Sequence, residues 1–131
     1  MRLRAHHLLC LQGFRGKGYD ARFTRTMKEI MNIIKLNPNL KVRVIDQCDI
    51  VCSICPWISD NRCMKEGVDR EEEIREGDME ILRFLELPIN TEMELKELFL
   101  LTRKKVPKLP SICKRCEWLD RGVCKVWKFL R

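Results

Sequence analysis

Apolar residues recur at helical spacing in the first third of the chain. The residues that follow this spacing of 3.6 per turn are Phe23, Met27, Ile30, Met31 and Ile34. Asp20 precedes them and is a residue type that caps the first turn of helices. Asn37-Pro38 follows them, and the residue before a proline disfavours helical backbone. The pattern therefore predicts a helix between Asp20 and Asn37.

Two more helices are predicted in the second half of the chain. One runs from about 68 to 87 and is stopped by Pro88, with acidic residues outside its apolar stripe. That stripe consists of Ile74, Ile81, Leu82 and Leu85. The next helix opens at Thr91 and Glu94, which have the spacing of a capping box. It continues through Leu95, Leu98, Phe99 and Thr102.

The strand signal is limited to one clear segment. KVRVI, residues 41–45, alternates and is rich in β-branched residues, and the segment around Leu3 is its expected partner. AHHLLCLQGF, residues 5–14, reads as a short helix that the following glycines interrupt, and residues 123–131 predict a short helical turn. We therefore expect a mainly α fold with a minimal two-stranded sheet.

Composition and charge narrow the class of protein. The 131 residues are 45% hydrophobic and 34% charged, which is typical of one small globular domain, here residues 1–131. No apolar run approaches the ~20 residues of a membrane span, so we expect no membrane association. The run Leu8–Leu11 is too short for a signal-peptide core, so we expect a cytoplasmic protein.

Charge is distributed unevenly along the chain. Residues 1–45 and 103–131 each carry ten Lys and Arg against two acidic residues, whereas residues 46–102 carry six against fifteen. An acidic middle can simply be neutralised by two basic ends. Alternatively, the two ends lie together and form a basic face for a polyanion such as a nucleic acid.

Six of the eight cysteines occur in two stretches with the same spacing. CSICPWISDNRC, residues 52–63, and CKRCEWLDRGVC, residues 113–124, both follow C-x2-C-x-W-x5-C, and we call them the first copy and the second copy. A CxxC pair places two thiolates on one turn, and a third cysteine can fold back to the same centre. Lys114, Arg115 and Arg62 supply positive charge that favours thiolates. The repeat therefore predicts two metal-binding loops, at 48–63 and 113–124.

Each copy needs a fourth ligand, and two cysteines remain. Cys48 is local to Cys52, Cys55 and Cys63. Cys10 would then join Cys113, Cys116 and Cys124 through the fold and bring the N-terminal helix against the second copy. For Cys10 the alternative is a buried small hydrophobe within LLCL.

The ligand pattern favours an iron–sulfur cluster, 4Fe-4S or 2Fe-2S, over zinc. Structural zinc held by four cysteines usually takes two CxxC pairs, whereas here one pair joins two scattered cysteines, as in iron–sulfur ligation. Trp57 and Trp118 are placed to shield a cluster from water, or are ordinary core aromatics. A third alternative is a disulfide framework, since the chain has a thermophile-like composition and hyperthermophiles use intracellular disulfides.

The segment LRAHHLLCLQGFRGKGY adds candidate residues near Cys10. On a helix His6 and His7 share the face of Cys10, as an alternative ligand, as hydrogen-bonding neighbours of a ligand sulfur, or as ordinary core residues. The glycine-rich GFRGKGY, with Arg15 and Lys17, is a weak candidate anion site and otherwise a flexible corner.

These motifs together resemble a known family. LRAHHLLCLQGFRGKGY, the approach Asp46…Cys52, Cys63 and CKRCEW…GVC resemble the domain of unknown function 1284 family of small bacterial and archaeal proteins, described as candidate iron–sulfur binders. The resemblance covers essentially the whole chain and implies no established activity. It implies functional roles for seven cysteines: Cys10, Cys52, Cys55, Cys63, Cys113, Cys116 and Cys124. Cys48 matches least well, which leaves open a single cluster with a second, partial or disulfide site.

The sequence thus predicts a metal-binding protein. We expect iron–sulfur binding for electron transfer or redox sensing with a redox partner protein. The alternatives are a zinc-stabilised module that binds a polyanion through its basic ends, and a disulfide-stabilised thermophile protein. No nucleophile–base pair is recognisable, so an enzymatic role is not indicated.

Overall fold

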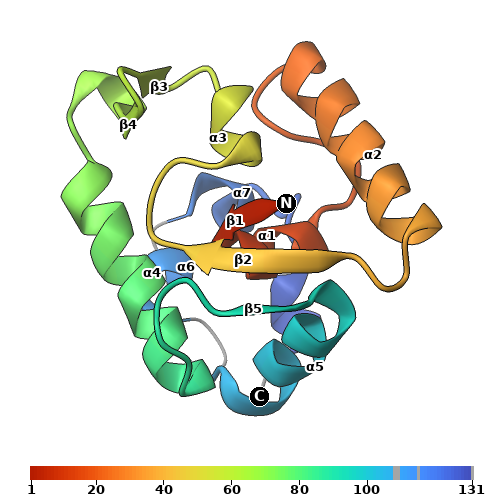
Figure 1. The fold of residues 1–131 in the computed structure, drawn as a ribbon. Helices are drawn as coiled ribbons and strands as arrows, with labels where there is room; N and C mark the ends of the chain where they lie inside the picture. The colour runs from red at the N-terminus through yellow and green to blue at the C-terminus, as the bar shows by residue number, and fades with distance from the viewer. Residues whose placement is uncertain (108–109, 115, 131) are drawn as a thin grey trace.

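The computed structural model describes residues 1–107, 110–114 and 116–130. It contains a three-stranded sheet with strand order β1-β2-β5 (Figure 1). Its strands are β1 (Arg2–Arg4), β2 (Lys41–Ile45) and β5 (Glu92–Glu94). β1 and β2 run parallel, with Leu3 opposite Val44, and β2 and β5 run antiparallel. The predicted pairing of the Leu3 segment with residues 41–45 is confirmed.

Two helices connect the parallel strands. They are α1 (His7–Gly13) and α2 (Ala21–Leu36). Asp20 caps α2 as predicted, because its side chain accepts a hydrogen bond from the backbone N–H of Phe23 at 2.7 Å. α2 ends at Leu36, with Asn37 as its C-cap as predicted, and buries Phe23, Met27 and Ile30.

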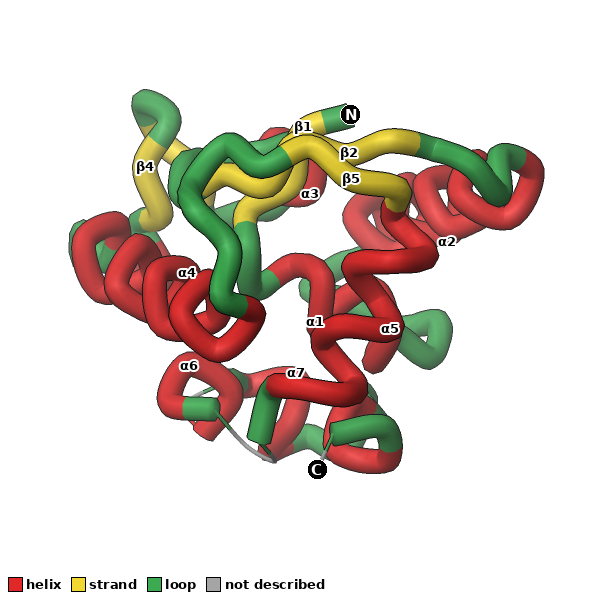
Figure 2. The backbone as a smooth tube through the Cα atoms, turned by 60° about the horizontal axis from the view of Figure 1, so that its bottom comes forward, coloured by secondary structure: helices red, strands yellow, loops and turns green. Residues whose placement is uncertain are grey.

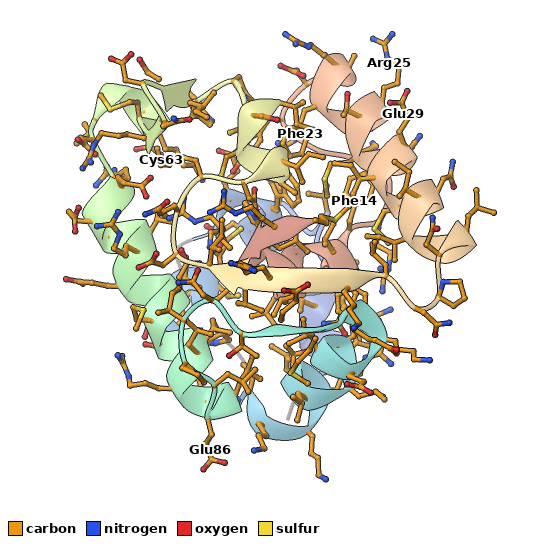
Figure 3. The ribbon with its side chains drawn as sticks, in the orientation of Figure 1. Phe14, Phe23, Arg25, Glu29, Cys63 and Glu86 are labelled. Carbon is orange, nitrogen blue, oxygen red and sulfur yellow. The ribbon has the colours of Figure 1, made fainter. Side chains whose placement is uncertain are left out.

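The first copy folds into short elements between β2 and the next long helix. They are α3 (Ile50–Ser53), the hairpin of β3 (Ile58–Ser59) and β4 (Arg62–Cys63), and the 3₁₀ turn η1 (Lys65–Gly67). Figure 3 places Cys63 on this hairpin, near α4 (Glu71–Leu85) and away from Phe14 and Phe23. α4 lies inside the predicted range 68–87.

The remaining helices complete the chain. α5 (Leu95–Lys105) is followed by the short α6 (Ser111–Lys114), α7 (Glu117–Asp120) and the 3₁₀ turn η2 (Val126–Lys128). The helical turn predicted near the C-terminus is therefore present. In the turned view of Figure 2, α1 and α5 lie beneath the sheet, with α6 and α7 beyond them.

One detail of the predicted helix after Pro88 is wrong. The helix begins at Leu95 instead of Thr91, because Glu92–Glu94 pairs with β2 as a third strand, with Met93 opposite Val42. The Thr91 hydroxyl donates to the carbonyl of Pro88 at 2.7 Å instead of capping the helix. The local capping signal was overridden by a tertiary strand pairing. The mainly α class with a small sheet is nevertheless confirmed.

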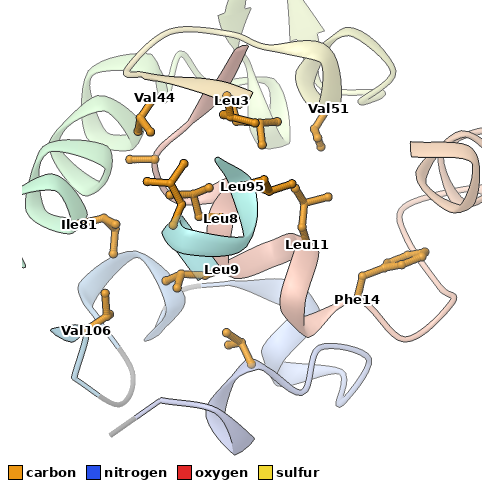
Figure 4. Close-up of a cluster of buried hydrophobic side chains, with 14 of the residues drawn as sticks. Leu3, Leu8, Leu9, Leu11, Phe14, Val44, Val51, Ile81, Leu95 and Val106 are labelled. Carbon is orange, nitrogen blue, oxygen red and sulfur yellow. The ribbon is translucent and has the colours of Figure 1, made fainter. Parts of the chain in front are cut away.

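Helix α1 lies at the centre of the hydrophobic core. Leu8, Leu9 and Leu11 are at most 1% exposed and contact the sheet, α4 and α5 through the same buried cluster (Figure 4). Two candidate site residues belong to this helix, since His7 is its first residue and Cys10 lies in its middle. Among the described residues, no helix has the length and apolar character to cross a membrane.

Candidate metal centre

The second copy closes against α1 at a point where only glycine fits. Phe14 and Cys124 form an isolated antiparallel bridge, and the N–H of Lys125 donates to the carbonyl of Gly13 at 2.9 Å. A Cβ at Gly13 would overlap the Cys124 sulfur and touch Val126. The end of α1 therefore lies directly against the second copy, as the candidate role of Cys10 required.

Cys10 lies beside the three cysteines of the second copy. Burial raises the pKa of Cys10 well above its ordinary value, and thiolate charge on Cys116, Cys113 and Cys124 raises it further. Burial likewise raises the pKa of Cys113 to about 12. The backbone N–H of Val126 donates to the Cys124 sulfur, which favours its thiolate, although burial still raises its pKa. The four cysteines are therefore near enough for their charges to interact, and a shared metal at Cys10, Cys113, Cys116 and Cys124 stays a prediction.

The first copy is held by a buried ionic network around Arg4. The Arg4 side chain is 1% exposed, its Nη2 lies 2.9 Å from Glu71 Oε2, and its Nε lies 2.8 Å from Asp78 Oδ2. Burial alone would lower the pKa of Arg4, but Asp78 and Glu71 outweigh burial and raise it. Glu71 also accepts the backbone N–H of Cys63 at 3.0 Å, so this network fixes the third cysteine of the first copy.

Asp49 fixes the start of the first copy in a similar way. Its Oδ1 accepts the N–H of Cys52 at 3.0 Å and caps α3, while its Oδ2 accepts the N–H of Arg4 at 2.8 Å and lies 2.7 Å from Nδ1 of His7. Burial opposes its ionisation, but His7 and these hydrogen bonds outweigh burial and lower the pKa of Asp49 to about 2.

Both predicted histidines are oriented by buried carboxylates. His6 Nδ1 lies 2.7 Å from Asp78 Oδ1, and His7 Nδ1 lies at the same distance from Asp49 Oδ2. The centroids of the two imidazole rings are 4.3 Å apart. Burial, with the neighbouring His7, lowers the pKa of His6 despite the opposing Asp78. Metal-ligating histidines characteristically donate their other ring nitrogen to such a carboxylate.

A cavity of about 900 Å³ is lined by residues of both copies. Its lining includes Arg4, His6 and His7. It also includes six cysteines: Cys10, Cys52, Cys55, Cys63, Cys113 and Cys116. Tyr19 also lines the cavity. Burial raises the pKa of its hydroxyl, and thiolate charge on Cys55, Cys116 and Cys10 raises it further. The two loops expected as separate sites therefore face one space.

Cys48 occupies different surroundings. It is not among the described residues that line the cavity, and its sulfur donates to the carbonyl of Asn61 at 3.1 Å and lies 3.8 Å from Glu71 Oε1. Burial and the Glu71 charge raise the pKa of Cys48. Arg4 Nη1 reaches both Cys48 and Cys52, at 3.9 and 3.8 Å.

The two predicted tryptophans differ in their packing. Trp118 is 4% exposed, lines the cavity and packs against Phe14, Tyr19 and Phe23 with ring centroids 5.3 to 6.2 Å away. Trp57 is only half-buried, and its backbone N–H donates to the Cys55 sulfur. Burial dominates there and raises the pKa of Cys55 to about 11.

The other predicted charges are mostly engaged elsewhere. Arg15 donates to the carbonyls of Gln12 and Phe14 at 2.9 Å and lies over the Phe129 ring, so its guanidinium supports the corner after α1. Arg62 pairs with Asp69 at 2.8 Å. Arg115 lies outside the described residues. An anion site at Arg15 and Lys17 stays a prediction.

Four important residues were missed by sequence reasoning: Arg4, Asp49, Glu71 and Asp78. A signal existed for two of them, because Glu71 and Asp78 fall on the apolar stripe of α4 together with Ile81 and Leu85, all buried. An acid on a buried stripe indicates a paired charge. Asp49 stands three residues before Cys52, which is the spacing of a helix cap.

Comparison with known proteins gives one match. The family model described as "Protein of unknown function (DUF1284)" matches residues 18–122. The chain matches no curated protein and no solved structure at a significant level. The match covers most of the chain and contains the first copy and the second copy as far as Gly122, so the protein belongs to the DUF1284 family of proteins of unknown function.

Proposed function

We propose that this protein binds iron–sulfur clusters in the cavity between its two cysteine copies. The observation that carries this proposal is the placement of Cys10, which comes from α1 and lies with Cys113, Cys116 and Cys124 at the far end of the sequence. Burial and mutual repulsion raise the pKa of Cys10 and Cys113, so the thiolates of this group become favourable only when a positively charged metal centre binds them. A shared metal centre gives those sulfurs a common partner.

The spacing of the sulfurs favours a cluster over a zinc ion. Within the described residues, His7, Asp49 and Cys52 form the one group whose donor atoms all lie within 4.8 Å of one another, and no three cysteine sulfurs are that close. Four thiolates on one zinc ion lie about 3.8 Å apart, as follows from a Zn–S distance of ~2.3 Å. Cysteines on different irons of a cluster lie farther apart.

The surroundings suit a cluster that exchanges electrons. A bound cluster supplies one-electron reduction and oxidation. The chain contributes burial by Trp118 and α1 around one set of sulfurs, and backbone N–H groups of Trp57 and Val126 donate to sulfurs of both sets. Hydrogen bonds to sulfur and exclusion of water are the means by which a protein adjusts a cluster's potential. We propose electron transfer or redox sensing, with a redox protein as partner.

The direct test is purification without oxygen, followed by measurement of iron, zinc and acid-labile sulfide on the same sample. We expect brown protein with iron and sulfide in equal amounts, because the clusters considered contain one sulfide for each iron. Colourless protein that carries zinc and no sulfide would contradict the proposal.

Two reciprocal variants test which cysteines hold which centre. Cys10→Ser should remove the iron and sulfide of one centre, and Cys63→Ser should remove those of the other, with the remaining centre still visible in the absorption spectrum. The double variant, Cys10→Ser with Cys63→Ser, should lose the iron and sulfide of both centres. If Cys10→Ser keeps the full iron content, Cys10 is not a ligand.

A further inference from the structure

His7 is the side chain best placed to complete the first copy. It belongs to the first turn of α1, its side chain is 10% exposed, and it lines the same cavity as Cys52, Cys55 and Cys63. One of its ring nitrogens lies within 4.8 Å of the Cys52 sulfur. A neutral imidazole and a thiolate at this separation can reach one iron.

The hydrogen bonds of His7 leave one nitrogen for a metal. Nδ1 lies 2.7 Å from Asp49 Oδ2, and both oxygens of Asp49 are already engaged by backbone N–H groups of Arg4 and Cys52. Three of the about four lone-pair directions of Asp49 are therefore taken, which makes it an orienting residue for His7 and Cys52. Nδ1 carries the proton towards Asp49, and Nε2 keeps the lone pair that binds metals.

The Asp49 carboxylate positions both Cys52 and His7. Asp49 caps α3 through the N–H of Cys52 and holds the His7 ring, so one buried group sets the separation of the thiol and the imidazole. His6 has a comparable bond to Asp78 but is absent from the group of donors within 4.8 Å among the described residues. This difference selects His7 over His6.

Cys48 is the competing candidate, and its contacts suit a protonated thiol. Its sulfur donates to a carbonyl oxygen of Asn61 and faces the carboxylate of Glu71. Cys124 also lies outside the cavity lining, but there a backbone N–H from Val126 donates to the sulfur, which suits a thiolate. Position outside the lining therefore does not by itself exclude a ligand. At Cys48 the two acceptors, at 3.1 and 3.8 Å, outweigh the one donor, Arg4 Nη1 at 3.9 Å, and disfavour ligation.

We propose that His7, through Nε2, is the fourth ligand of the cluster held by Cys52, Cys55 and Cys63, in place of Cys48. This inference rests on the proposed function. The two copies then differ chemically, since one centre has four cysteine ligands and the other has three cysteines and a histidine. Histidine ligation raises a cluster's reduction potential, so the first-copy centre is the more readily reduced of the two.

The chain allows a sharp test with matched asparagine variants. Asparagine keeps a donor at the position of Nδ1, so His7→Asn retains the bond to Asp49 and removes only Nε2. We expect His7→Asn to lose the iron and sulfide of one centre, and Cys48→Ser and the control His6→Asn to keep both. Thermal unfolding followed by circular dichroism checks that each variant is folded.

Spectroscopy tests ligation independently of cluster yield. The chain has only two histidines, so labelling histidine with ¹⁵N in the His6→Asn variant marks His7 alone. The reduced protein should show ¹⁵N hyperfine coupling to the cluster in pulsed electron paramagnetic resonance. His7→Cys should retain the cluster, lose that coupling and have a more negative reduction potential.

The outcomes separate the inference from the proposed function. Protein without iron or sulfide would overturn both. Full clusters in His7→Asn, loss of a centre in Cys48→Ser, or absence of histidine coupling in a cluster-loaded protein would overturn the ligand assignment and leave iron–sulfur binding intact.

Discussion

The two copies of C-x2-C-x-W-x5-C have the same spacing but are held in place by different forces. The second copy is held by apolar packing: Trp118 lies among Phe14, Tyr19 and Phe23, and Cys124 presses on Gly13. The first copy is held by buried charge, with Arg4 and its carboxylates bonded to the loop backbone. A repeated ligand spacing therefore does not imply a repeated environment.

This difference has a functional consequence. Apolar packing excludes water around the second copy, where the nearby charges are Glu80 beside Cys113 and Arg15 and Lys125 beside Cys124. The network around the first copy instead places the Asp49 carboxylate and the Arg4 guanidinium beside Cys52. Both burial and neighbouring charge influence a cluster's potential. The copies are thus suited to centres of unequal potential, in agreement with the histidine ligand proposed for the first.

The largest expected effect comes from removing the charge that holds the first copy. Arg4→Met keeps apolar bulk but leaves Glu71 and Asp78 buried without their partner, which should lower the free energy of unfolding by about 3–5 kcal/mol. Urea denaturation of the cluster-free protein measures this change.

A neighbouring arginine provides the control for Arg4. Arg43 lies on β2 and pairs with Glu92 at 3.2 Å, with half of each side chain exposed, so Arg43→Met should cost at most about 1 kcal/mol. Equal effects of the two variants would mean that the buried network does not hold the first copy.

The corresponding change for the second copy is Gly13→Ala. The added methyl group would overlap the Cys124 sulfur and crowd Val126, so overpacking should lower the free energy of unfolding by about 1–3 kcal/mol. The iron and sulfide of the centre that contains Cys10 should fall, while the other centre is retained.

Gly16→Asn is the control for this substitution. Gly16 has φ of +92°, and asparagine tolerates left-handed backbone better than most residues. A Cβ added at Gly16 would have no neighbour closer than Lys28 Cε, at 3.8 Å. The Gly16→Asn variant should keep the iron and sulfide of both centres. Loss of both centres in Gly13→Ala would show that the copies are not independently supported.

Acid should weaken the first copy selectively. The pKa of Asp49 is lowered in the folded state to about 2, so the unfolded chain binds its proton more readily and folding is favoured above the unfolded value near 3.8. As pH falls from about 4 to about 2, the cluster-free protein should lose about 2 kcal/mol through this group.

The pH dependence is read from urea unfolding at several pH values. The pKa of Asp78 is also lowered, by His6 and Arg4 against the effect of burial, so its contribution is lost in the same direction. Asp49→Asn should flatten the curve in this range. An unchanged slope in that variant would assign the acid sensitivity to other groups.

The smallest effect is expected for Arg62, although it adjoins Cys63 in sequence. Its guanidinium pairs with Asp69 on the exposed surface at 2.8 Å, and surface ion pairs contribute little. Arg62→Ala should leave stability and both centres nearly unchanged, as measured by urea unfolding and iron content. A marked loss of iron would instead support the predicted role of Arg62 as a positive charge that favours the thiolates.

Local patterns determined much of this protein. The spacing of apolar residues located α2 and α4, Asp20 and Asn37 marked the ends of α2, and the alternation in KVRVI identified β2. The cysteine repeat identified both loops, and counting the remaining cysteines predicted that Cys10 would lie near the second copy, where the fold places it. These features depend on neighbours within a few residues, or on ligand number, and a sequence displays both.

Only the tertiary structure decided the rest. Glu92–Glu94 became a strand because β2 offered a partner, although its local signal favoured a helix start. Arg4 is buried because Glu71 and Asp78 face it from α4, and His7 is oriented because Asp49 lies across from α1. Each of these contacts joins residues more than forty positions apart. Their energies come from desolvated charge and strand pairing, which arise only when distant segments meet.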